Sequence, residues 1–97
     1  MLEVLDIGDN SIGGQIPKSM GDMKNLKSLF LKGNSFFGFL PPELGNLKNL
    51  KQAGFEGNLL VGNVPMELCG LTQMTELSAD CGGREPLMQC ACCTLCV

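Results

Sequence analysis

The chain has 97 residues and a net charge of -3, with 18% charged and 44% hydrophobic residues. This length suits one domain at most. So high a hydrophobic content with so few charges excludes an intrinsically disordered chain. Lysines and acidic residues are interspersed, so nothing indicates a surface for nucleic acid or for a membrane. The longest apolar run is only a few residues, too short to span a bilayer.

One 24-residue pattern recurs along most of the chain. It fills residues 2–25, 26–49 and 50–73, and a fourth unit begins at Met74 and leaves the pattern after Asp80. So many matches at one fixed spacing are typical of a repeat stack, in which each unit contacts only its neighbours. We therefore predict a repeat domain over residues 1–80, with 74–80 a partial unit, and a cysteine-rich C-terminal cap over 81–97.

Each unit opens with three apolar residues, the last two of which are separated by the period of a β-strand. These residues are Leu2, Leu5 and Ile7, then Leu26, Leu29 and Leu31, then Leu50, Ala53 and Phe55. The pattern predicts one short strand per unit, with its apolar side chains pointing inward. Successive strands are expected to add side by side into a parallel sheet.

The remainder of each unit predicts a turn, a bend and a short helical segment. An asparagine follows each strand, where its side chain can both donate and accept, so that a column of them satisfies the backbone of successive turns. A glycine then allows the backbone to bend, and a proline starts a helical turn. These residues are Asn10, Asn34 and Asn58, Gly14, Gly38 and Gly62, and Pro17, Pro41 and Pro65.

The second unit reads Leu26-x-x-Leu29-x-Leu31-x-x-Asn34, then Gly38-x-Leu40-Pro41-x-x-Leu44-Gly45-x-Leu47. This pattern resembles the plant-type leucine-rich repeat of receptor-like kinase ectodomains, polygalacturonase-inhibiting proteins and related secreted proteins. The resemblance covers residues 2 to about 80 and implies an α/β solenoid with a parallel sheet on its concave face. It also implies a second, shorter sheet, and 3₁₀ or short helical turns on the convex face. Ala53 and the bulky run 36–39 depart from the pattern.

Six cysteines allow two kinds of chemistry. They are Cys69, Cys81, Cys90, Cys92, Cys93 and Cys96. An even count favours a disulfide framework, for which six cysteines allow fifteen connectivities. The adjacent Cys92 and Cys93 are not expected to pair, because their Cα atoms are about 3.8 Å apart and a disulfide needs roughly 4.4–6.8 Å.

The alternative is a zinc site built from the last four cysteines. Structural zinc sites usually use two C-x-x-C pairs, whereas this tail supplies one such pair and no histidine. Disulfides are therefore favoured, and they imply an oxidising compartment. The tail also resembles the cysteine-bearing caps of secreted leucine-rich repeat proteins. We expect an extracellular or cell-surface location.

The sequence offers few residues that could act in catalysis. The sequence contains no histidine, the commonest general base, and no phosphate-binding glycine loop. The acidic residues fall at positions expected to face solvent. We therefore predict a protein that is not an enzyme and that binds no metal or other cofactor.

The outward strand positions form the expected concave surface. Those proposed to contact a ligand are Asp6, Ser28, Phe30, Lys32, Gln52 and Glu56. Phe30, the one large aromatic residue among them, is either a binding anchor or a cover for neighbouring backbone.

The predicted function is recognition of a protein, peptide or glycan, by a receptor-like or secreted protein. A structural wall or matrix protein is the alternative. The chain enters its first repeat without a polar capping unit or a signal peptide, so we expect further repeats upstream in a longer parent.

Overall fold

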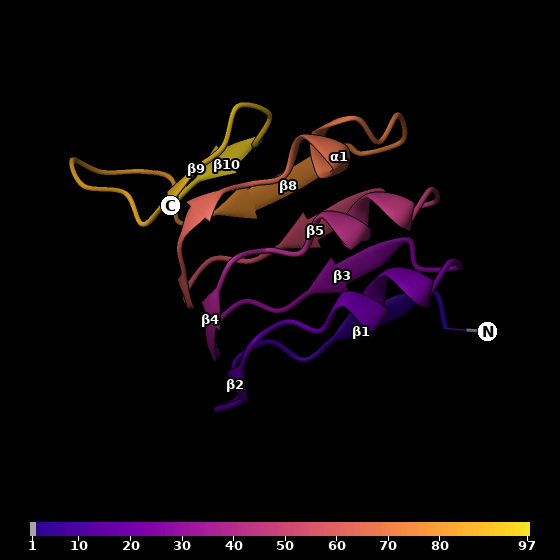
Figure 1. Cartoon of the computed structure of the whole chain (residues 1–97), viewed down its shortest axis with the longest axis horizontal. Helices are drawn as coiled ribbons and strands as arrows, with labels where there is room; N and C mark the ends of the chain where they lie inside the picture. The colour runs from indigo at the N-terminus through magenta and orange to yellow at the C-terminus, as the bar shows by residue number, and fades with distance from the viewer. Residues whose placement is uncertain (1) are drawn as a thin grey trace.

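The computed structural model describes residues 2–97, which form a solenoid of stacked units with three sheets (Figure 1). The largest sheet is parallel and has the strand order β1-β3-β5-β8-β10. Its strands are β1 (Val4–Asp6), β3 (Ser28–Phe30), β5 (Gln52–Gly54), β8 (Glu76–Ala79) and β10 (Leu95–Cys96). The first four open successive units, as the pattern predicts.

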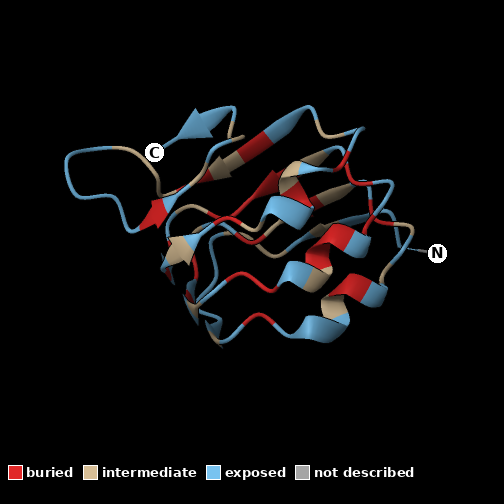
Figure 2. Cartoon of the chain, turned by 45° about the horizontal axis from the view of Figure 1, so that its top comes forward, coloured by how far each residue is buried: buried red, intermediate tan, exposed pale blue. Residues whose placement is uncertain are grey.

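The repeat length sets the register of this sheet. Leu5 pairs with Leu29, Leu29 with Ala53, and Ala53 with Leu77, so equivalent residues lie side by side. These side chains point into the core, and those of the second, third and fourth units are almost fully buried. Figure 2 shows the buried residues gathered between the large sheet and the helical segments. The inward column predicted from strand spacing is present.

Two smaller sheets follow the asparagine turns. One has the strands β2 (Gly13–Gly14), β4 (Ser35–Gly38) and β6 (Leu59–Leu60). The other pairs β7 (Gly62–Asn63) with β9 (Met88–Gln89). Gly14, Gly38 and Gly62 all have positive φ, from 84° to 92°, a conformation that residues with a side chain rarely adopt.

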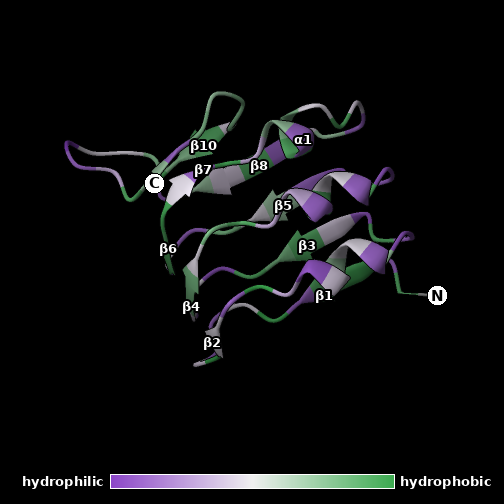
Figure 3. Ribbon diagram, viewed as in Figure 1, coloured by the Kyte–Doolittle hydropathy of each residue, from purple (hydrophilic) through white to green (hydrophobic). Residues whose placement is uncertain are grey.

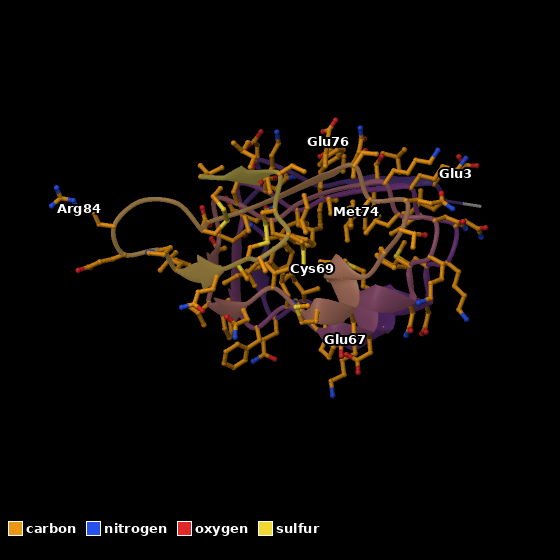
Figure 4. The ribbon with its side chains drawn as sticks, turned by 90° about the horizontal axis from the view of Figure 1, so that it is seen from above. Glu3, Glu67, Cys69, Met74, Glu76 and Arg84 are labelled. Carbon is orange, nitrogen blue, oxygen red and sulfur yellow. A yellow bond between two sulfur atoms is a disulfide. The ribbon has the colours of Figure 1, made fainter. Side chains whose placement is uncertain are left out.

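A short helical segment completes each unit. These segments are η1 (Lys18–Asp22), η2 (Pro42–Asn46) and α1 (Met66–Cys69), and each follows a proline. Seen from above, they lie on the side of the molecule opposite the large sheet (Figure 4). Glu76 projects from the sheet side and Glu67 from the helical side, with Met74 between the two layers.

The helical segments stack so closely that glycine is required between them. A Cβ on Gly45 would lie 2.6 Å from Glu67 Cβ and 2.9 Å from the Glu67 carbonyl oxygen of the next unit. Cys69 occupies the equivalent position one unit later, where no further helical segment follows within residues 2–97. A side chain is therefore accommodated there, and its sulfur forms a disulfide with Cys92.

The asparagine column connects the turns of successive units. Asn58, which is buried, donates from Nδ2 to the carbonyl oxygens of Leu31 at 2.9 Å and Phe55 at 3.0 Å. Its Oδ1 accepts from the backbone N–H of Phe36 at 3.0 Å. Asn34 forms the same kind of bonds to Ile7, Leu31 and Ile12. Each asparagine thus satisfies backbone groups of its own unit and of the unit before it.

The outer side of the first unit is less covered than the later units. Leu2 and Ile12 are 49% and 39% exposed, whereas their equivalents Leu26 and Phe36 are 0% and 5% exposed. No further unit packs on that side within residues 2–97. Figure 3 shows hydrophobic and hydrophilic residues mixed along the strands and the segments that join them.

Residues 81–97 add one strand to the large sheet and one to the two-stranded sheet, which the repeat pattern did not predict. β9 pairs with β7 and β10 pairs with β8, so the segment folds back along the fourth unit. All six cysteines are paired, as Cys69–Cys92, Cys81–Cys96 and Cys90–Cys93. Cys92 and Cys93 bond to different partners, as their spacing requires. The four cysteines of the alternative zinc site are all in disulfides, so none offers a thiolate to a metal.

Candidate recognition surface

The large sheet presents one face that no helical segment covers, which we call the open sheet face. It is the face expected to be concave. The parallel register arranges its outward side chains in columns across the strands. Its residues include Val4, Ser28, Gln52 and Glu76 in the first column, Asp6, Phe30, Gly54 and Ser78 in the second, and Gly8, Lys32, Glu56 and Asp80 in the third.

The first column is a chain of polar contacts between neighbouring strands. Ser28 Oγ donates to Gln52 Oε1 at 3.0 Å, and Gln52 Nε2 lies 3.5 Å from Glu76 Oε1. The glutamine is therefore oriented from both sides. Cross-strand pairs of this kind are typical sheet contacts, and the groups that they leave unused face solvent as hydrogen-bonding sites for a ligand.

Phe30 dominates the second column but is only half-exposed. It lies beside Gly54 in the next strand, and its Cδ1 is 3.3 Å from the place where a Cβ on Gly54 would be. The ring therefore occupies space that a side chain at position 54 would need. Of the two interpretations of Phe30, the structure shows the cover: its ring lies against the backbone of Gly54. The other interpretation, a binding anchor, stays a prediction.

The acidic residues of the third column have specific partners within the sheet. Glu56 Oε1 accepts from Ser78 Oγ at 2.7 Å. Asp80 accepts from the backbone N–H groups of Gly57, at 3.0 Å, and Asn58, at 3.3 Å. In the earlier units a carbonyl oxygen has this role, since Gly33 N–H donates to the Glu56 carbonyl. The Asp80 carboxylate thus satisfies two backbone N–H groups in the turn of the third unit.

Charge on this face is mixed near its centre. Lys32 is exposed, beside the half-exposed Glu56 in the third column. Asp6 is exposed in the first unit and accepts from the Gly8 backbone N–H at 3.0 Å. The six predicted ligand-contact residues therefore share one face, with Phe30 in their midst.

Sequence reasoning missed two residues on this face. β10 pairs Leu95 with Ser78, which extends the second column, and Val97 follows beside Asp80, where its N–H donates to the Ala79 carbonyl at 3.0 Å. Leu95 is 56% and Val97 58% exposed. The apolar run over residues 95–97 was the only available signal, and it is too short to distinguish a strand from a tail.

Two grooves lie on the flank, away from the open sheet face. The first, of about 400 Å³, is lined by Gln15, Pro17, Lys18, Phe39 and Pro41, among others. The second, of about 280 Å³, lies between residues 63–66 and 89–91. Neither is lined by a predicted ligand-contact residue. Both are largely apolar clefts between consecutive units.

Residues 2–97 contain no group of three or more His, Cys, Asp or Glu side chains arranged to hold a metal ion. Over the same residues, no helix has the length and apolar character that crossing a bilayer would need.

The comparisons with known proteins agree on one architecture. The Leucine Rich Repeat family model matches residues 1–23 and 25–47. The plant peptide hormone receptor RGFR1, solved in complex with RGF2, is 34% identical over 89% of this chain and 12% of its own, with a TM-score of 0.72. The Arabidopsis receptor kinase HAESA, solved with the peptide hormone IDA and the co-receptor SERK1, is 35% identical over 80% of this chain and 13% of its own, with a TM-score of 0.74.

A shorter relative gives the same result. The leucine-rich repeat ectodomain of the receptor kinase SOBIR1 from Arabidopsis thaliana is 33% identical over 78% of this chain and 41% of its own, with a TM-score of 0.72. This chain thus spans less than half the length of each of these three receptors. None of the curated proteins compared matches the sequence. The repeat pattern, the stacked parallel strands and these structural likenesses together show that the chain belongs to the leucine-rich repeat family, in its plant type.

Proposed function

We propose that this chain is a recognition module that binds a peptide or protein segment on the open sheet face. One observation carries the proposal: Phe30 presents a half-exposed ring between hydrogen-bonding groups on both sides. On one side lie the polar side chains of Ser28, Gln52 and Glu76, which contact one another. On the other side lie Lys32 and Glu56. A central aromatic residue with a polar surround is the usual composition of a binding hot spot.

The structural relatives support this ligand class. RGFR1 was solved in complex with RGF2, and HAESA in complex with a peptide hormone. Both are receptors with at least 34% identity to the aligned part of this chain. An extended peptide can lie across parallel strands and contact several columns at once, which suits a face built from one strand per unit.

The three disulfides support an extracellular or cell-surface location, since such bonds persist in oxidising compartments. The open sheet face carries both acidic residues and a lysine, which suits a ligand of mixed charge.

Selection from a library of random linear peptides, displayed on phage and panned against the folded chain, tests the proposal without knowledge of the natural ligand. Binders that are displaced from the wild-type chain by the free selected peptide, and that lose affinity for the Phe30→Ala variant, are the expected result. A selection that yields no peptide binder, or only binders indifferent to Phe30, would instead favour a structural wall or matrix protein. A parallel glycan array distinguishes a carbohydrate ligand from a peptide.

A further inference from the structure

The last strand of the large sheet is held in an unusual way. β10 contains only Leu95 and Cys96, and all four residues from Thr94 to Val97 are exposed. No side chain of this segment is therefore buried in the core. This segment is held to β8 by a few hydrogen bonds of its backbone and of the Thr94 hydroxyl, which are individually modest in water. The other four strands of the sheet each carry at least one side chain that packs into or against the core.

The hydrogen bonds of β10 are few and specific. The Thr94 N–H donates to the Leu77 carbonyl at 2.8 Å, and the Val97 N–H donates to the Ala79 carbonyl at 3.0 Å. Thr94 Oγ1 accepts from the Leu77 N–H at 2.9 Å, and the Gly82 N–H donates to the Val97 carbonyl at 3.1 Å. The Cys81–Cys96 disulfide adds the one covalent tie between β10 and the end of β8.

The three disulfides differ in their access to solvent. Five of the cysteines are partly buried and pack against the core, whereas Cys96 is exposed and does not. The Cys81–Cys96 bond is therefore the disulfide that includes an exposed cysteine. Exposed disulfides are generally the labile or regulatory ones, because exchange depends on access to a sulfur atom.

The disulfides also differ in what their opening would release. Cys69–Cys92 joins the tail to α1, whose Leu68 is fully buried, so the helix stays anchored without the bond. Cys90–Cys93 joins two residues that are three apart in the sequence. It follows β9, whose Met88 is buried. Only the Cys81–Cys96 bond secures a strand that has no core anchor of its own.

We propose that Cys81–Cys96 is a reducible latch, a substrate for thiol–disulfide exchange with a dithiol oxidoreductase, and that its opening releases β10 from the large sheet. A reductant thiolate attacks Cys96 Sγ and forms a mixed disulfide, while Cys81 departs as a thiolate and takes up a proton. The second thiol of the reductant then displaces Cys96 as a thiol. The reductant leaves as its own disulfide, so two electrons have passed to the protein.

Release of β10 changes the sheet in two ways. The edge of β8 loses its partners and presents unpaired backbone groups, an edge to which another strand can pair. Leu95 and Val97 also leave the open sheet face, where they extend two of its columns. Only this second consequence, a redox-dependent ligand surface, rests on the proposed function; the opening of the latch does not.

Stepwise reduction of the full chain tests the order of opening. The folded protein is titrated with dithiothreitol, trapped with N-ethylmaleimide and mapped by peptide mass spectrometry. The expected first product carries two labels, on Cys81 and Cys96. First labelling of either other pair, or an all-or-none change from no labels to six, would overturn the proposal.

Hydrogen exchange then tests the release of the strand. In the Cys81→Ser/Cys96→Ser variant, the Thr94, Val97 and Gly82 amides are expected to lose protection by about tenfold or more. The Phe55 amide, which donates to the Ser78 carbonyl across the other edge of β8, should keep its protection. The matched Cys90→Ser/Cys93→Ser variant should retain protection at Val97. Equal protection at Val97 in both variants would contradict the latch.

The same exchange measurement on the wild-type chain, held at the dithiothreitol concentration that gives the two-label product, does not depend on the folding of either variant. Loss of protection at Thr94 and Val97 there supports the proposal, and retained protection overturns it. Neither result depends on a ligand, so failure of the latch and failure of the recognition function are separate outcomes.

Discussion

The ring of Phe30 lies over the backbone of Gly54, the residue paired with it on the next strand. The absence of a side chain at position 54 gives the ring its place on the open sheet face. The same arrangement leaves one aromatic side chain half-exposed at the centre of that face. A glycine in the third unit therefore sets the place of an aromatic side chain of the second unit on the open sheet face.

Glycine substitutions on the two sides of the molecule are expected to differ in their effect on stability. A Cβ at position 54 would meet the movable ends of Phe30, Glu56 and Ser78, at 3.2–3.3 Å. Gly54→Ala should therefore cost less than about 1 kcal/mol, partly offset by the lower entropy of the unfolded chain. Gly45→Ala would meet the Glu67 backbone and should cost about 1–3 kcal/mol. Urea titration of both variants measures the difference, and the reverse order would be inconsistent with the packing described.

The asparagine column predicts a second contrast. Asn58→Ala would leave the Phe36 N–H and the Phe55 carbonyl without their buried partner, at a cost of about 1–3 kcal/mol. Asn10 is exposed, and water can replace its bonds to the Ile7 and Gly8 carbonyls. Asn10→Ala should therefore be the milder change in thermal or urea unfolding. Equal losses of stability in the two variants would mean that burial of the turn does not determine how much its asparagine contributes to the free energy of unfolding.

The disulfide framework is tested by peptide mapping without reduction. Proteolysis of the oxidised chain should yield linked peptides containing Cys69–Cys92 and Cys81–Cys96, together with an internal Cys90–Cys93 bond. Alkylation before digestion should label no cysteine. Four or more free thiols accompanied by bound zinc would restore the metal site, and a different pairing would reject the arrangement of the tail.

The first unit is expected to be the least protected part of the solenoid. The Ile7 amide, which donates to the Phe30 carbonyl, should exchange faster than the Leu31 amide, which donates to the Gly54 carbonyl, because only the second lies between two covered units. Fusion of a copy of residues 26–49 before Leu2 should bury Leu2 and Ile12, slow Ile7 exchange and raise the free energy of unfolding by one inter-unit interface. Unchanged stability and exchange would show that residues 2–25 already form a competent end.

The sequence predicted the repeated elements well, because their physical determinants recur at fixed spacing. Leu29 predicted the inward column and Asn34 the turn column, and both positions have the contacts expected of them. The two interpretations of Phe30 could not be separated from the sequence, because the position of its ring depends on Gly54, a residue in the next unit. β10 was missed because Leu95 and Cys96 obey no repeat pattern. The pairing of Cys69 with Cys92 could not be derived either, since it depends on how the tail folds back.

The most direct test of the recognition surface compares matched substitutions on two faces. Phe30→Ala and Lys32→Ala alter the open sheet face, whereas Phe39→Ala and Lys48→Ala remove exposed side chains of the same types elsewhere. Binding of a selected peptide is measured by isothermal titration for all four variants, with urea unfolding as the check on folding. We predict that Phe30→Ala weakens the Kd about fivefold or more, equivalent to about 1 kcal/mol, that Lys32→Ala weakens it measurably, and that the two controls leave it unchanged. Equal losses from Phe30→Ala and Phe39→Ala, or a loss confined to the controls, would contradict the assignment of ligand binding to the open sheet face.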